Sequence, residues 1–89
     1  MRTYYRSTTE TWHGNEADVW YEFDGQTPVR QVTRVGERWL SSLDDNDPDV
    51  GPLLTDQPLQ PGEFEADEES SAEEFEQAWA KAVAAREGR

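Results

Sequence analysis

β-Branched and aromatic residues dominate the first 43 residues, and turn residues interrupt them at short intervals. This pattern predicts antiparallel strands, because such side chains suit a pleated, half-buried surface. One run covers residues 3–12. In the next run, Val19, Tyr21 and Phe23 alternate with Trp20 at the period of two expected of a half-buried strand. We expect the first three to face the core and Trp20 to face outward.

Further strands follow at once. Residues 24–26 (Asp-Gly-Gln) are a hairpin turn signal. A third run, from Val29 to Val35, ends at Gly36, and a short fourth run surrounds residues 38–40. The first part of the chain is therefore predicted to form a three- or four-stranded antiparallel meander.

Residues 44–70 fit neither a helix nor a strand pattern. Prolines at positions 48, 52, 58 and 61 exclude a continuous helix or a central strand. A loop of this length is unusual in a compact domain. We expect it to lie over the sheet, and the alternative is partial disorder. Four apolar side chains would anchor it: Leu53, Leu54, Leu59 and Phe64.

The last segment has the pattern of a helix. Ser71 and Glu74 have the spacing of a capping box, and apolar residues then recur on one stripe. This stripe consists of Phe75, Ala78, Trp79, Ala82 and Val83. We expect Phe75 and Trp79 to pack on the sheet. The predicted fold is a single α+β domain of residues 1–89, with a β-meander (1–43), an acidic Pro-rich loop (44–70) and a helix (71–87).

The composition limits both the core and the compartment. Only 34% of the residues are hydrophobic, so four Trp, three Tyr and three Phe must supply much of the core. The absence of cysteine excludes disulfides and thiolate zinc sites, and it suits a reducing cytoplasm. No apolar run approaches the ~18–20 residues that span a bilayer, and residues 1–6 lack the apolar stretch of a signal peptide. We expect a soluble, cytoplasmic protein.

The net charge of −12 is unevenly distributed. Residues 1–43 hold six acids and five arginines, a net charge of −1, whereas residues 44–89 hold fourteen acids and three basic residues, a net charge of −11. Such a charge argues against direct binding to nucleic acid or to anionic membranes, because both attract clustered Lys and Arg. A charged partner is therefore expected to be basic.

No motif indicates catalysis. The only histidine, His13, lies in a Trp-His-Gly turn with no cysteine in the chain and no Gly-x-Ser-x-Gly elbow. We interpret it as a turn histidine that hydrogen-bonds the backbone. No glycine-rich phosphate loop precedes the helix. We therefore expect neither an enzyme nor a cofactor.

One metal pattern remains as an alternative. Its four acids approach the spacing of an EF-hand calcium loop. They are Asp45, Asp47, Asp49 and Asp56. The turn glycine, however, falls at Gly51, nearby prolines stiffen the loop, and no helix precedes it. No metal site is expected here, and calcium binding stays the alternative.

The dense run of acids near the helix is the strongest functional signal. A net charge of about 2–8 already keeps a small domain soluble, and this chain exceeds that range. A solvated surface is the alternative to a surface that steers a basic partner. The predicted partner-binding residues are Glu63, Glu65, Asp67, Glu68, Glu69, Glu73, Glu74 and Glu76, with Trp20 as the aromatic anchor.

Three arginines lie on or beside the third predicted strand: Arg30, Arg34 and Arg38. Arg30 and Arg34 share one face of that strand, where pairing with Glu22 or with the acidic loop is expected. The alternative is an arginine patch that binds a carboxylate or a phosphate.

The order of segments resembles a family of small acidic bacterial proteins known only as a domain of unknown function. The matching residues are Trp12-His13, the strands at 18–24 and 29–35, and the helix from Ser71 to Ala82. The resemblance implies no activity and no site residues. In size and charge the chain is also similar to immunity proteins that bacteria pair with toxins.

We therefore expect an immunity-type inhibitor that occludes the basic site of a partner protein, such as a toxin or nuclease. The alternatives are a nucleic-acid mimic that titrates a DNA-binding protein and a calcium-binding module.

Overall fold

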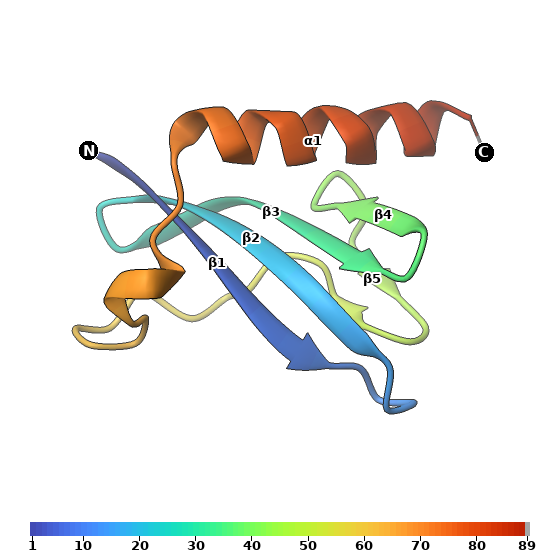
Figure 1. Cartoon of the computed structure of the whole chain (residues 1–89), viewed down its shortest axis with the longest axis horizontal. Coiled ribbons are helices and arrows are strands. Elements are labelled where there is room, and N and C mark those ends of the chain that lie inside the picture. The colour runs from blue at the N-terminus through green and yellow to red at the C-terminus, as the bar shows by residue number, and fades with distance from the viewer. Residues whose placement is uncertain (89) are drawn as a thin grey trace.

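The computed structural model describes residues 1–88 and contains a four-stranded antiparallel sheet whose strands follow one another in chain order. The strands are β1 (Arg2–Glu10), β2 (Glu16–Asp24), β3 (Thr27–Val35) and β4 (Arg38–Ser41). After them come β5 (Asn46–Asp47), β6 (Gly51–Pro52), the 3₁₀-helix η1 (Ala66–Glu68) and the helix α1 (Ala72–Glu87). Figure 1 shows α1 lying along one face of the sheet. The predicted α+β class is confirmed.

Glycine forms the two tight hairpins of the meander. Each loop, between β2 and β3 and between β3 and β4, has two residues. The first loop residue is Gly25 or Gly36, with φ of 61° or 60°, and no other residue type in residues 1–88 has a positive φ. A positive φ at the first position alone is the type II′ turn, whose twist matches the flanking strands. Both predicted turns are confirmed.

The face of the sheet beneath α1 holds the main core. Its buried residues are Trp20, Val32, Phe75, Ala78 and Ala82, and Tyr4, Trp39 and Trp79 are half-buried around them. Trp20 stacks on Trp39 with ring centroids 5.4 Å apart. The prediction that Phe75 and Trp79 pack on the sheet is confirmed.

The prediction that Trp20 faces outward is wrong. Only 5% of Trp20 is exposed, because α1 covers the face of β2 on which it lies. Val19 and Phe23 are also buried, on the opposite face of the strand. Alternation separates the two faces of a strand but does not say which of them is covered. Here both faces are covered, so Trp20 is not available as an anchor for a partner.

Residues 44–70 cover the second face of the sheet, as predicted. Phe64 stacks on Tyr5 with ring centroids 4.5 Å apart, and its ring lies 5.2 Å from that of Tyr21. Leu53 is 1% exposed. The backbone N–H of Leu59 donates to the carbonyl of Gln26 at 2.9 Å. Figure 1 shows this segment, in yellow, crossing the sheet on the side away from α1. The protein therefore has three layers.

The helix begins with half of the predicted capping box. Ser71 Oγ accepts a hydrogen bond from the Glu74 backbone N–H at 3.0 Å. The Glu74 carboxylate does not return to the backbone of Ser71 but accepts from Trp20 Nε1 at 3.0 Å. A buried indole N–H needs an acceptor. Glu74 therefore links the helix to the sheet.

Ser71→Ala is expected to lower the free energy of unfolding by about 1 kcal/mol, because it removes the acceptor of an N–H in the first helical turn. Ser70→Ala is the matched control, since Ser70 Oγ is buried without a hydrogen-bond partner in the described chain. Its effect should stay within about 0.5 kcal/mol. Urea denaturation measures both variants. Equal losses in the two would show that the Ser71 hydroxyl contributes nothing as a cap.

No helix within residues 1–88 combines the length and the apolar character needed to cross a membrane.

Candidate functional site

The acidic segment turns back along β1, which is an edge strand of the sheet. Glu69 forms an isolated antiparallel bridge with Tyr5. The Ser70 backbone N–H donates to the Tyr4 carbonyl at 2.9 Å. These contacts hold η1 beside the first half of β1. Within residues 1–88, no strand lies along the outer side of the second half.

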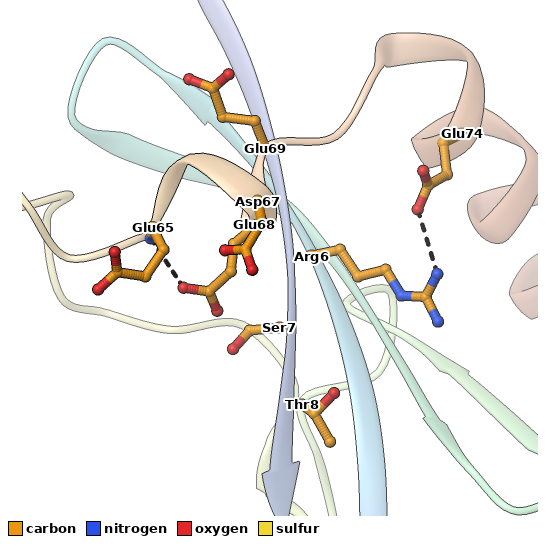
Figure 2. Close-up of a pocket in the computed structure, with 8 residues that line it drawn as sticks. All are labelled: Arg6, Ser7, Thr8, Glu65, Asp67, Glu68, Glu69 and Glu74. Atoms are coloured by element: carbon orange, nitrogen blue, oxygen red, sulfur yellow. Dashed lines mark hydrogen bonds and ion pairs between the residues drawn. The ribbon is translucent and has the colours of Figure 1, made fainter.

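A cleft of about 630 Å³ opens between β1 and the acidic segment. Figure 2 shows carboxylates of the η1 segment on one side of β1 and Glu74, from the start of α1, on the other. We call this the acidic cleft, and its lining residues are Arg6, Ser7, Thr8, Glu65, Asp67, Glu68, Glu69 and Glu74.

Neighbouring polar groups hold the Glu68 carboxylate in place within the acidic cleft. Its carboxylate accepts a hydrogen bond from the Glu65 backbone N–H at 2.9 Å. This bond, together with the Ser7 hydroxyl, holds the pKa of Glu68 below its usual range. The Glu68 carboxylate is therefore ionised at neutral pH.

Arg6 is the only basic residue among those that line the acidic cleft. Its guanidinium lies 3.6 Å from Asp18 and 3.7 Å from Glu74. It also lies over the Trp20 ring, 5.0 Å from the centroid. The sheet and the helix therefore already engage the charge of Arg6.

Every arginine in residues 1–88 forms an ion pair. Arg30 contacts two carboxylates, those of Glu22 and Glu76. Arg30 bonds Glu22, which is only 3% exposed, and its Nη2 lies 2.7 Å from Glu76 Oε2. The guanidinium lies 4.9 Å from the ring centroids of both Phe75 and Trp79. The hydrogen bonds from Arg30 hold the pKa of Glu22 below its usual range, although burial alone would raise it.

Arg34 and Arg38, the other two arginines on or beside β3, also form internal ion pairs. Arg34 bonds Asp18, and Arg38 Nη1 bonds Asp47 of the acidic loop at 3.0 Å. The predicted internal pairing of Arg30, Arg34 and Arg38 is confirmed, but the partner of Arg34 is Asp18 and not Glu22 or the acidic loop.

Half of the acids that lack a basic partner within residues 1–88 lie in one segment. Other such acids are scattered over the chain, but this segment alone has six in close succession: Glu63, Glu65, Asp67, Glu68, Glu69 and Glu73. Every described guanidinium group is thus engaged by an internal ion pair, and four of these six unpaired acids line the acidic cleft beside β1.

The structure brings together most of the predicted acids. Those that line the acidic cleft are Glu65, Asp67, Glu68, Glu69 and Glu74. The other three do not line it. Glu76 binds Arg30, Glu63 lies beside Tyr21 on the loop-covered face, and Glu73 is exposed in the first turn of α1.

The sequence did not identify the β1 side of the acidic cleft, which consists of Arg6, Ser7 and Thr8. The β-branched run marked these residues as a strand. Nothing in it marked that strand as an edge, because edge position depends on pairing with segments far away in the chain.

The four acids of the calcium alternative are not brought together. Asp47 accepts hydrogen bonds from Arg38 and from the backbone N–H groups of Asp49 and Val50. The bond from Arg38, above all, lowers the pKa of Asp47. Residues 1–88 contain no group of three or more His, Cys, Asp or Glu arranged to hold a metal ion. The short β5–β6 hairpin occupies the position of the candidate calcium loop. Asp45 and Asp56 therefore belong to no metal-binding group within residues 1–88.

His13 ties the β1–β2 turn to the β5–β6 hairpin. Its Nδ1 lies 2.7 Å from Asp49 Oδ1, and its backbone N–H donates to the same oxygen at 3.3 Å. Burial alone would raise the pKa of Asp49, but hydrogen bonds from Thr11, Asn15 and the His13 backbone hold it below its usual range. The imidazole thus contacts a carboxylate and not the backbone group predicted for it.

No protein-family model matches the chain, and no match was found among curated proteins or solved structures. The resemblance to a bacterial family of unknown function, and the similarity in size and charge to immunity proteins, therefore stay predictions.

Proposed function

We propose that the protein is a non-enzymatic binding protein whose acidic cleft receives a basic surface of a partner protein. In this proposal it acts as an immunity-type inhibitor and occludes the basic site of a toxin or a nucleic-acid-acting enzyme. One observation carries the proposal. Four acids without a basic partner line the acidic cleft beside the β1 edge, whereas every described arginine, including Arg6 of the cleft, is already paired.

The physical reason is electrostatic complementarity. Sites that act on nucleic acids are lined by Lys and Arg, because they must attract phosphates. A surface of fixed carboxylates attracts such a site and raises the association rate by ~10–10³. Once bound, the acidic protein blocks access of the phosphate backbone to these Lys and Arg side chains. Because these carboxylates line a cleft of about 630 Å³, a partner must also fit the cleft, which favours one partner over other basic proteins.

The double variant Asp67→Lys/Glu69→Lys is expected to slow association with the partner by about tenfold and to flatten its salt dependence. Both residues line the acidic cleft and are exposed, so the fold should tolerate the change. The control is Glu37→Lys/Glu87→Lys, which changes the net charge equally at exposed residues outside the acidic cleft. Glu74 and Glu76 are unsuitable, because they bond Trp20 and Arg30.

The measurement has two steps. Capture from a lysate of the source cell at low salt, with the parent and both variants, identifies a protein that only the Asp67/Glu69 variant fails to retain. Stopped-flow kinetics across a salt series then gives the association rates, and an activity assay of the captured protein tests occlusion. Equal association rates for the two double variants at low salt would show that the acidic cleft does not steer binding.

A further inference from the structure

The outer edge of β1 carries backbone groups whose direction follows from the pairing. The Tyr4 carbonyl accepts from Ser70, so the polar backbone groups of Tyr4 point away from β2. By contrast, Met1 and Thr11, which flank β1 and are odd-numbered, form bonds on the β2 side. The Met1 carbonyl accepts from the Gly25 N–H, and the Thr11 N–H donates to the Asn15 carbonyl. Backbone direction alternates along an antiparallel strand. The N–H and C=O groups of the even-numbered residues of β1 therefore face outward.

In the second half of β1, these outward groups belong to Arg6, Thr8 and Glu10. The Tyr5–Glu69 bridge directs the Arg6 N–H at the Glu68 carbonyl, but no backbone or side-chain group within residues 1–88 bonds the outward groups of Thr8 and Glu10. Natural edge strands are usually protected by proline, by bulges or by a covering segment. Here β1 pairs with β2 through nine uninterrupted residue pairs and contains no proline, and residues 68–70 cover it only as far as the Arg6 N–H. The second half is an open edge of regular geometry.

The acidic cleft lies on this open edge, since Arg6, Ser7 and Thr8 line it. We propose that an extended, basic segment of the partner protein adds to β1 beside Arg6–Glu10 as a fifth strand. This inference rests on the proposed function and specifies how the partner binds. Main-chain hydrogen bonds to the outward groups supply affinity, and the carboxylates of the acidic cleft select Lys or Arg side chains.

The charge of the acidic cleft identifies the occupant. Side chains of an added strand alternate between the two faces of the sheet. On one face they meet the η1 acids Asp67 and Glu68, and on the other they meet Glu74. A basic side chain therefore finds acids without a basic partner on the η1 face, and on the other face it finds Glu74, which also contacts Arg6 and Trp20. A second copy of this chain, with a net charge of −12, would instead bring like charges together along the edge.

The test uses a defined peptide as the probe. It is an acetylated and amidated nonapeptide of alternating lysine and valine, and its control is the same peptide methylated at every backbone nitrogen. The two have the same charge, but only the first has donors for a strand ladder. We expect the unmethylated peptide to bind more tightly, on the order of a hundredfold, because several hydrogen bonds are lost together on methylation.

Two protein variants locate the binding. Thr8→Pro removes an outward N–H without removing a ladder bond to β2, and Thr8→Ala keeps that N–H. Thr8→Pro is expected to weaken peptide binding by about fivefold, and Thr8→Ala should not change it. Thermal unfolding confirms that both are folded. In the parent, amide hydrogen exchange should slow on peptide binding at Thr8 and Glu10, with no change at Ser7 and Thr9.

Each outcome decides between the two proposals. Equal binding of both peptides, abolished by Asp67→Lys/Glu69→Lys, would overturn strand addition and leave the proposed function standing. Binding of neither peptide at low salt would overturn both. Slow exchange at Thr8 and Glu10 in the parent without peptide, with a dimer by sedimentation equilibrium, would identify a second copy as the occupant and overturn the basic partner strand.

Discussion

Trp20→Ala is expected to lower the free energy of unfolding by about 3–5 kcal/mol, which is enough to unfold much of a domain this small. The indole is 5% exposed and contacts the core formed with Val32 and Phe75. Its removal leaves a cavity between sheet and helix. It also deprives the Glu74 carboxylate of the indole N–H, 3.0 Å away. Urea denaturation monitored by circular dichroism measures the loss.

Trp12→Ala is the matched control for Trp20→Ala. Trp12 is 74% exposed, so its truncation should cost less than about 1 kcal/mol. Equal stability of the Trp20→Ala variant and the parent would contradict the burial of Trp20. It would also return Trp20 to the role of a surface anchor.

Arg30→Met is expected to lower the free energy of unfolding at pH 7 by about 3 kcal/mol, because it leaves the buried carboxylate of Glu22 without its main partner. Arg34→Met is the matched control. Arg34 is 42% exposed, and its partner Asp18 keeps a second arginine, so the loss should stay below about 1 kcal/mol. If both variants lose the same stability, the Glu22–Arg30 pair is no stronger than a surface pair.

The pH dependence of Arg30→Met gives an independent check with a definite sign. In the parent, Arg30 holds the pKa of Glu22 below 4.5, so the stabilisation is complete above that pH and is lost as the pH falls through the lowered pKa. In the variant, only Tyr4 and Arg2 remain to lower the pKa of Glu22 against the effect of burial. We therefore expect this pKa to rise. The stability gap between parent and variant should therefore narrow from pH 7 to pH 4. A gap that is constant with pH would mean that lost packing, not the carboxylate, causes the effect.

The elements of this fold were predictable because their signals are local. Gly25 and Gly36 stand at positive φ in two-residue loops, alternation marks β2, and Ser71 caps the helix that Phe75 fixes to the sheet. Each of these signals lies within a few neighbouring residues, so the sequence is enough to predict them.

The errors concern contacts between distant segments. Trp20 was assigned to the outside because a single strand does not reveal that α1 covers one face and residues 44–70 the other. Glu74 was assigned to a capping box, but it binds an indole that lies 54 positions earlier in the chain. The β1 side of the acidic cleft was missed for the same reason. The acids themselves were predictable from their density, whereas the edge beside them was not.

The position of α1 at the end of this fold has a consequence for how the chain acquires its structure. The helix is synthesised after all four strands, yet Phe75 fills the core over Val32, and Glu74 accepts the Trp20 indole bond. Until Ala72–Glu87 leave the ribosome, the meander has one face without its cover, with the aromatic rings of β2 and β4 facing water. The main core therefore closes late, through contacts that are distant in the chain, and such closure is slow compared with helix or hairpin formation. During that interval the nascent chain presents an apolar surface to chaperones and to other nascent chains.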